Sequence, residues 1–293
     1  MLDRGAIGAF ALATALCLSG AGAFAFDDAQ YPDFNGKWNR APTPGAPRTP
    51  QPAYDPTKGW GKAQGAPLTP EYTAIFEANE KDQAEGGAGT TRGFTCRTGG
   101  MPLIMTLFQS METVVLPDTT YMLIDRNNIQ RRVFTDGRDW PAQIEPSYVG
   151  YSIGRWIDAA GSGRYDTLEI ETRAFKGPRT YDASGLPLHF DNQSIIKERM
   201  YLDRGDKNPA DKNLMHNDIT VIDHALTRPW TVGKIYRRDP SPRPLWVEED
   251  CVEGNPWVEI GAQAYMRSAD GELMPAKKDQ PPPDLRYFNQ TKK

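Results

Sequence analysis

Apolar and polar residues alternate in short runs over most of the chain from Glu112 onward. A period of two is typical of a strand with one buried face. Turn-forming pairs such as Pro117-Asp118, Asn127-Asn128 and Asp136-Gly137 separate the runs. The pattern predicts nine strands: Thr113 to Leu116, Tyr121 to Asp125, Ile129 to Phe134, Tyr151 to Asp158, Thr167 to Thr172, Ser194 to Leu202, Asn217 to Asp223, Thr231 to Arg237 and Leu245 to Cys251.

Short strands joined by short turns favour a mainly β fold, an antiparallel meander that is closed as a barrel or folded as a sandwich. We favour a lipocalin-like barrel, because closure removes the exposed edges of the strands. Gly36-Lys37-Trp38 fits this expectation, since lipocalin-like barrels often close one end with the tryptophan of a Gly-x-Trp motif. An aromatic anchor at the start of any β domain would give the same three residues.

One short helix is predicted before the run of strands. Thr69 suits the cap and Pro70 suits the first helical position. Tyr72 and Phe76 then follow at helical spacing. The segment Ala41 to Pro70 is rich in proline and glycine, so we expect it to wrap the surface in extended form.

The N-terminus has the features of an export signal. Asp3-Arg4 leads into the apolar run Ala6 to Leu18, and Ala23-Phe24-Ala25 gives the small-x-small pattern of a cleavage site. Cys17 does not fit a lipoprotein anchor, because Leu16 stands where a small residue is expected. We therefore expect a periplasmic or secreted protein. No later stretch approaches the roughly 20 apolar residues of a spanning helix, which predicts no integral membrane segment.

The bulk composition narrows the possible partners and the domain plan. The chain has 293 residues, a net charge of -4 and scattered rather than clustered lysine and arginine. This argues against binding to nucleic acid or to an anionic membrane. The predicted plan is a signal peptide at 1–25, a first strand, Pro-rich wrap and helix at 26–95, a β-barrel at 96–260 and a C-terminal extension at 261–293.

Two cysteines, Cys96 and Cys251, remain after the signal is removed. An even number of cysteines in an oxidising compartment favours a disulfide between them. Two free thiols or a pair of metal ligands would be the alternatives, but the wide separation and the lack of a Cys-x-x-Cys motif argue against them.

Strand alternation also predicts an unusual pair of charges in the barrel. Glu198 shares a strand face with Ile196 and Met200, and Arg131 shares one with Val133. A buried charge is costly unless it is paired, so an inward Arg131–Glu198 pair is expected. Such a pair either fixes the strand register or provides a carboxylate with a shifted pKa for acid–base work.

Several polar and aromatic residues lie in or near the turns. Asp136-Gly137 is explained by turn formation, but Arg138 has no role in the turn. With Arg155 and Trp156 it is a candidate for the rim of a pocket that recognises a carboxylate or a polar ligand. Trp140 and Trp156 could together stack against a ring-shaped ligand.

The histidines do not have the spacing of a metal site. Of His189, His216 and His224, no two stand two or four residues apart, although His189 is near Asp191 and His224 follows Asp223. No metal ligand is therefore assigned, and no motif for a cofactor or an activated serine is found. His189 is the best acid–base candidate among the three, because it lies on a predicted loop.

The order of several short motifs resembles a widespread uncharacterised family of secreted bacterial proteins. The family has an Arg-Arg-x-Tyr-x-Asp-Gly-Arg motif, a Ser-x-Gly-x-Trp-x-Gly-Asp-Thr-Leu run and a Glu-Arg pair. This chain differs in having Asp139-Trp140 where the family carries a histidine, and in a longer hairpin at Ala159 to Arg164. The matching segments are Arg131 to Arg138, Gly150 to Trp156, Asp166 to Thr172 and Glu198-Arg199.

These observations predict an exported protein that binds a small apolar or aromatic compound in a barrel cavity. It could convert this compound by cofactor-free acid–base chemistry of the lyase, isomerase or hydratase type. A ligand carrier without chemistry, or an envelope protein that acts through protein contacts, would be the alternatives. The candidate residues are Glu198, Asp136 and His189 for catalysis, and Arg131, Arg138, Arg155, Trp156, Arg199 and Trp140 for binding.

Overall fold

The computed structural model describes residues 27–41, 57–58, 61–85, 89, 99–106, 110–206, 209–246, 257–260, 263–267 and 273–275. The chain divides into two compact units, Met1–Asp250 and Cys251–Lys293. The predicted signal peptide, Cys96, Cys251 and most of the Pro-rich wrap lie outside the described residues. Among the residues that are described, no helix is long and apolar enough to cross a membrane.

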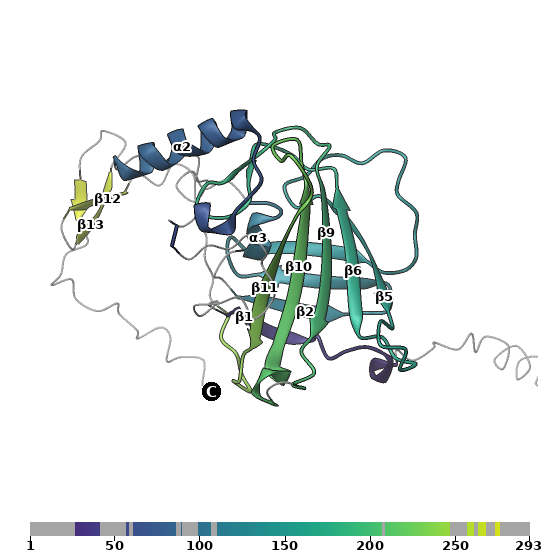
Figure 1. Ribbon diagram of the computed structural model, residues 1–293. Coiled ribbons are helices and arrows are strands. Elements are labelled where there is room, and N and C mark those ends of the chain that lie inside the picture. The colour runs from purple at the N-terminus through teal and green to yellow at the C-terminus, as the bar shows by residue number, and fades with distance from the viewer. Residues whose placement is uncertain are drawn as a thin grey trace, which may run out of the picture. The chain divides into compact units, whose positions relative to one another are not determined.

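The first unit is a closed β-barrel, as the alternation predicted (Figure 1). Around the barrel the strands follow the order β1-β11-β10-β9-β6-β5-β4-β3-β2, and β2 pairs with β1 to close it. The strands of the barrel are β1 (Gly36–Arg40), β2 (Met111–Val115), β3 (Thr119–Ile124), β4 (Ile129–Phe134), β5 (Tyr151–Ile157), β6 (Thr167–Arg173), β9 (Ile195–Leu202), β10 (Leu214–Ile222) and β11 (Trp230–Arg238).

One neighbouring pair departs from the predicted meander. β4 and β5 run parallel, and only Val133↔Ser152 and Phe134↔Ile153 are in register. Two parallel neighbours cannot be joined by a tight turn. The connecting segment 135–150 therefore stands away from the wall, and Figure 1 shows it as the long teal loop beside β5 and β6.

The structure corrects the start of the predicted strand Leu245 to Cys251. Leu245 and Trp246 lie outside any strand, Leu245 is 82% exposed, and residues 247–251 are outside the described part. Prolines at 240, 242 and 244 precede this segment and remove backbone donors that a sheet would need. β1 takes the closing position instead, between β2 and β11.

The predicted helix is confirmed as α2 (Pro70–Ala84), which is capped by Thr69 and buries Tyr72 and Phe76. The structure also contains further short elements. They are α3 (Leu103–Thr106), the 3₁₀ turns η1 (Asp28–Gln30), η2 (Lys62–Gln64) and η4 (Pro209–Asn213), the strand pair β7 (Arg179–Thr180) and β8 (Pro187–Leu188), and, in the second unit, the three-stranded sheet β12 (Trp257–Ile260), β13 (Gln263–Arg267) and β14 (Leu273–Pro275).

The barrel interior is filled by inward side chains of every strand. Most are apolar, and Trp38 is fully buried with its indole nitrogen donating to Phe34 O at 2.8 Å. Polar exceptions also point inward, among them Arg131, Glu198 and Lys234. The lumen therefore has a mainly apolar core that contains a small number of buried charges.

Candidate functional site

A groove of about 650 Å³ lies on the outer wall of the barrel, next to the loop 135–150. Trp140 of this loop forms one side, and strands β5, β6, β9 and β10 form the floor. A half-open hollow of this size is typical of sites for small molecules. The residues of the groove are Trp140, Ile153, Gly154, Arg155, Glu169, Ile170, Glu171, Lys197, Glu198, Arg199, Asp218 and Thr220.

The strand register explains why the floor is charged. Arg155 pairs with Glu169, Glu169 with Arg199, and Arg199 with Asp218, so these four residues form one row across four strands. Alternate residues of a strand point to opposite faces. Because Glu198, next to Arg199, points into the lumen, the row itself lies on the outer face of the barrel.

Most charges of the groove are held in ion pairs, and Arg199 and Asp218 are the exceptions among the described residues. Arg155 binds Glu169 at 2.7 Å, and Lys197 lies 3.4 Å from Glu171. The guanidinium of Arg199 lies over the ring of Tyr201 at 5.1 Å. Within the part of the chain that the structure describes, Arg199 makes no side-chain hydrogen bond or ion pair. It is therefore the cation of the groove that is best placed to receive an anionic group.

Asp218 is the acidic counterpart of Arg199 in the same row. Partial burial raises the pKa of the Asp218 carboxyl above its ordinary value, while the charges of His216 and Arg199 act in the opposite direction. A carboxyl group that holds its proton to higher pH is better suited to proton transfer near neutrality. The groove thus combines an available cation with a carboxyl of shifted pKa.

The loop that carries Trp140 is anchored at its start by a local ion pair. Arg138 binds the Asp136 carboxylate at 2.6 Å, lies over the Phe134 ring at 3.8 Å and donates to Tyr151 Oη at 3.3 Å. Tyr151 in turn lies 6.0 Å from Trp140, between ring centroids. Asp136 and Arg138 therefore bind each other and position the loop, and their roles in catalysis and ligand binding stay predictions.

Glu198 lies in the lumen, where the predicted inward pair with Arg131 is confirmed. Arg131 Nη1 lies 3.1 Å from Glu198 Oε1, and Arg131 Nη2 binds the other carboxylate oxygen. Asn217 adds a hydrogen bond of 2.9 Å to Glu198 Oε1. Arg131 also donates to Thr172 at 3.0 Å and to Ser152 at 3.3 Å. Both Arg131 and Glu198 are thus already hydrogen-bonded to side chains of neighbouring strands.

The remaining predicted residues fall in other places. Trp156 packs against Tyr31 and Phe34, with ring centroids 5.4 and 5.2 Å away, and it is not among the residues of the groove. No hydrogen bond or ion pair joins Glu198, Asp136 and His189 to one another in the described structure. The groove brings together three of the predicted binding residues, Trp140, Arg155 and Arg199.

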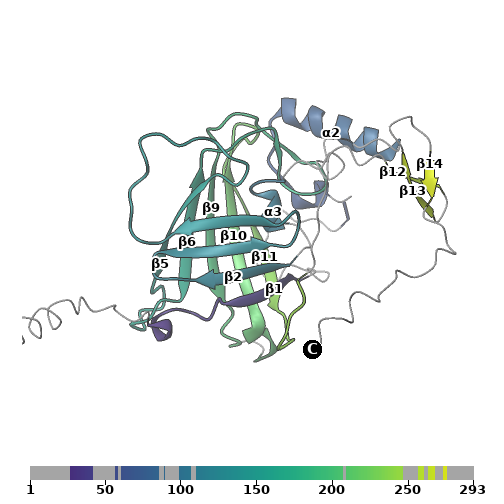
Figure 2. The same ribbon diagram turned by 180° about the vertical axis from the view of Figure 1, so that it is seen from behind.

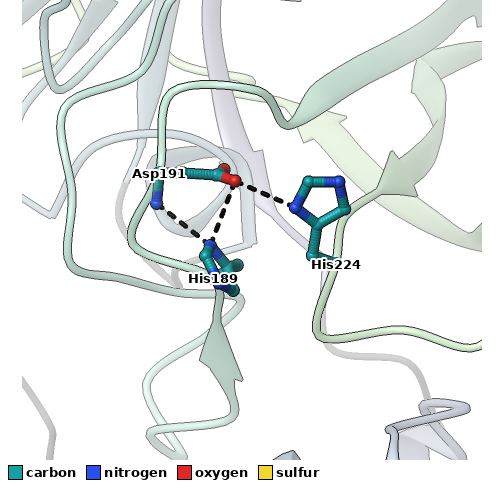
Figure 3. A group of neighbouring side chains, drawn as sticks. All are labelled: His189, Asp191 and His224. Carbon is teal, nitrogen blue, oxygen red and sulfur yellow. Dashed lines mark hydrogen bonds and ion pairs between the residues drawn. The ribbon is translucent and has the colours of Figure 1, made fainter.

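A second polar cluster involves His189 (Figure 3). His189 and Asp191 lie on the loop between β8 and β9, and His224 lies just after β10. Asp191 Oδ2 is 3.2 Å from His189 Nδ1 and 2.9 Å from His224 Nδ1. The third histidine, His216, is elsewhere and binds Asp203 at 3.1 Å.

Sequence reasoning missed four charged residues of the groove: Glu169, Glu171, Lys197 and Asp218. The signal that could have found them is the strand alternation that placed Glu198 in the lumen, because it also places residues 197 and 199 outside. The row across the strands depends on register, which the sequence of one strand does not specify.

No protein-family model and no curated protein matches the chain. The resemblance of its motifs to a secreted bacterial family stays a prediction.

Proposed function

We propose that this is an exported protein that binds a small organic compound with an aromatic or apolar body and an anionic group. The binding site is the groove beside Trp140. The observation that carries the proposal is the guanidinium of Arg199, which binds no acidic side chain among the described residues and lies in a hollow of about 650 Å³. The outer wall is preferred to the lumen because Arg131 and Glu198 already bind each other there.

The chemistry of the groove sets the class of ligand. Trp140 and Ile153 offer apolar surface, and an indole face suits a ring. A guanidinium binds a carboxylate or phosphate through charge-assisted hydrogen bonds. Glu169 and Glu171 are held by their own cations, so they do not cancel the charge of Arg199. An aromatic carboxylate or sulfonate satisfies both parts of the site.

Binding can be measured with 8-anilinonaphthalene-1-sulfonate, a fluorescent aromatic anion. We expect saturable fluorescence with one site per chain, and Arg199→Ala should weaken it about 10- to 100-fold, the size of a lost charge-assisted hydrogen bond. The matched control is Arg164→Ala, which removes another exposed arginine, at the tip of the β5–β6 hairpin and outside the groove. Equal affinity of Arg199→Ala and the unchanged protein would refute the site.

Asp218 favours a second candidate function, cofactor-free acid–base conversion of the bound compound. Its raised pKa and its place beside Arg199 suit proton abstraction next to a carbonyl whose charge Arg199 would stabilise. The test is exchange of the carbon-bound protons of phenylpyruvate in D₂O, followed by NMR. Exchange that is faster than in buffer and lost in Asp218→Asn supports catalysis. Binding without exchange leaves the carrier function alone.

A further inference from the structure

We propose that His189, Asp191 and His224 form a binding site for a divalent transition-metal ion such as Zn²⁺ (Figure 3). The site does not depend on the groove, because none of the three residues belongs to it. Two imidazoles and one carboxylate are the ligand types that zinc, cobalt and nickel accept. Calcium and magnesium prefer oxygen ligands alone, so they are not expected here.

The distances between the ligand atoms suit a single ion. Asp191 Oδ2 lies between the two Nδ1 atoms, at 2.9 Å from that of His224 and 3.2 Å from that of His189. Ligands bound at zinc distances in a tetrahedral site are about 3.3 Å apart. The three ligand atoms all lie within 4.8 Å of one another, so small side-chain rotations bring them to these distances. The side chain of His224 is 59% exposed, which leaves room for that rotation.

The hydrogen bonding around His189 leaves two acceptors facing each other. The backbone N–H of Asp191 donates to His189 Nδ1 at 3.2 Å, which assigns the ring proton to Nε2. The lone pair of Nδ1 then lies 3.2 Å from the carboxylate oxygen Asp191 Oδ2, another acceptor. A proton on Nδ1 would satisfy the carboxylate but would oppose the Asp191 N–H. A metal ion would bind both acceptors at once, and the Asp191 N–H would then give up its bond to Nδ1.

The buried ion pair between Arg179 and Asp223 fixes the backbone around the cluster. Asp223 accepts from the backbone N–H of His189 at 2.9 Å and from that of Ala225 at 2.8 Å. Asp223 and Ala225 flank His224 in the chain. Arg179 donates to His189 O at 2.8 Å and to Asp191 O at 3.2 Å. The loops that carry all three side chains are thus tied to the same pair. Outer hydrogen bonds of this kind orient metal ligands and tune their affinity.

Aromatic rings shield one side of the cluster while the other stays open to solvent. Phe190 stacks on the His189 ring at 4.6 Å, and Tyr72 of α2 lies 5.9 Å from it, between centroids. The side chains of His189 and Asp191 are 25% and 21% exposed. An ion can therefore reach the site from solvent, and three protein ligands leave a coordination position for water or another small ligand.

The experiment is calorimetric titration of untagged, EDTA-treated full-length mature protein with ZnCl₂. We expect one Zn²⁺ per chain, and His224→Gln should weaken binding by about 100-fold, the upper range for disturbing a metal site. Asp191→Asn, which keeps the shape of the side chain, should do the same. Circular dichroism establishes that both variants are folded.

His216→Gln is the matched control, because it removes the third histidine of the chain, which binds Asp203 outside the cluster. Zinc affinity should not change in this variant. The proposal is overturned if the unchanged protein takes up no zinc, if His224→Gln and Asp191→Asn bind as tightly as the unchanged protein, or if His216→Gln is the variant that loses the ion.

Discussion

Two buried arginine–carboxylate pairs in this protein have the same burial but serve different parts of the structure. In both the Arg131–Glu198 pair and the Arg179–Asp223 pair, the arginine side chain is 1% exposed and the acid is 0% exposed. Arg131 binds side chains of the barrel wall, whereas the partners of Arg179 and Asp223 are mostly backbone groups of loops.

This difference shows that the burial of an ion pair does not by itself reveal its role. The Arg131 network joins side chains of β3, β4, β5, β6, β9 and β10, and all of them point into the same lumen. It therefore holds the strands of the wall in register. The Arg179 network ends on the main chain beside His189 and His224, whose side chains reach solvent. The Arg179 network therefore fixes the positions of the two imidazoles.

The largest expected effect is the loss of the lumen pair. Glu198→Gln leaves the Arg131 charge buried without a counter-charge, so the free energy of unfolding should fall by about 3–5 kcal/mol. Urea denaturation measures it. Arg131→Met combined with Glu198→Leu should recover part of the loss, because no charge is then buried. A change below 1 kcal/mol in the single variant would mean that the lumen admits water.

Asp223→Asn should lower the stability less than Glu198→Gln does, but it should disturb the loops that carry His189 and His224 more. The free energy of unfolding should fall by about 2 kcal/mol, because Arg179 keeps its hydrogen bonds to backbone carbonyls. Zinc affinity should fall about 10- to 100-fold. Glu198→Gln should not change zinc affinity in the folded protein. If both variants lowered zinc affinity equally, the two ion pairs would not have the different roles described above.

Lys234 is a third buried cation in the same unit, and it has no bound counter-charge. It forms no hydrogen bond or ion pair with the residues that the structure describes. Burial and, to a smaller extent, the charge of Arg40 lower the pKa of its ammonium to about 7, while the charge of Asp182 acts in the opposite direction. The Tyr181 ring lies 5.4 Å from its nitrogen, and Tyr236 is inward on the same strand.

Stability should therefore rise with pH above 7. The unfolded chain keeps the lysine proton up to its ordinary pKa of 10.5, whereas the folded chain releases it near 7, so the unfolded state binds more protons in between. From pH 7 to 9 the gain should be about 2 kcal/mol. Above pH 10 the raised pKa values of Tyr181 and Tyr236 should reverse the trend. Denaturation of Lys234→Met should show no such rise.

The smallest effect is expected for the exposed pair on the outer wall. Arg155 and Glu169 bind each other at 2.7 Å, but their side chains are 76% and 33% exposed. Glu169→Gln should change the free energy of unfolding by about 0.5 kcal/mol or less, and added salt should reduce even this. A loss comparable to that of Glu198→Gln would show that burial does not separate these pairs.

Local patterns predicted the barrel and its interior pair because both depend on alternation within single strands. Glu198 and Arg131 stand among apolar neighbours at every second position, which is enough to place them inside. The cap at Thr69 predicted the start of α2 for a similar reason, since the signal lies within one turn.

The closing strand and the two candidate sites could not be predicted in this way, because they depend on contacts between distant parts of the chain. Closure by β1 depends on the pairing of Trp38 with Arg238, from the first and last strands of the barrel. The approach of His189 and His224 depends on where two loops end after the strands have paired, and no spacing in the sequence encodes it. The position of Trp140 depends on the parallel pair β4 and β5.

The parallel pairing of β4 and β5 gives the chain a long segment outside the barrel wall. Had β4 and β5 been antiparallel, a two-residue turn would have joined them and left the outer wall bare. Because the chain must instead travel back before β5 begins, it gains a segment that contributes Trp140 to the groove and no strand to the barrel. Substitutions there can alter the proposed ligand preference while the packed interior keeps its sequence, so the proposed binding and the folding depend on different residues.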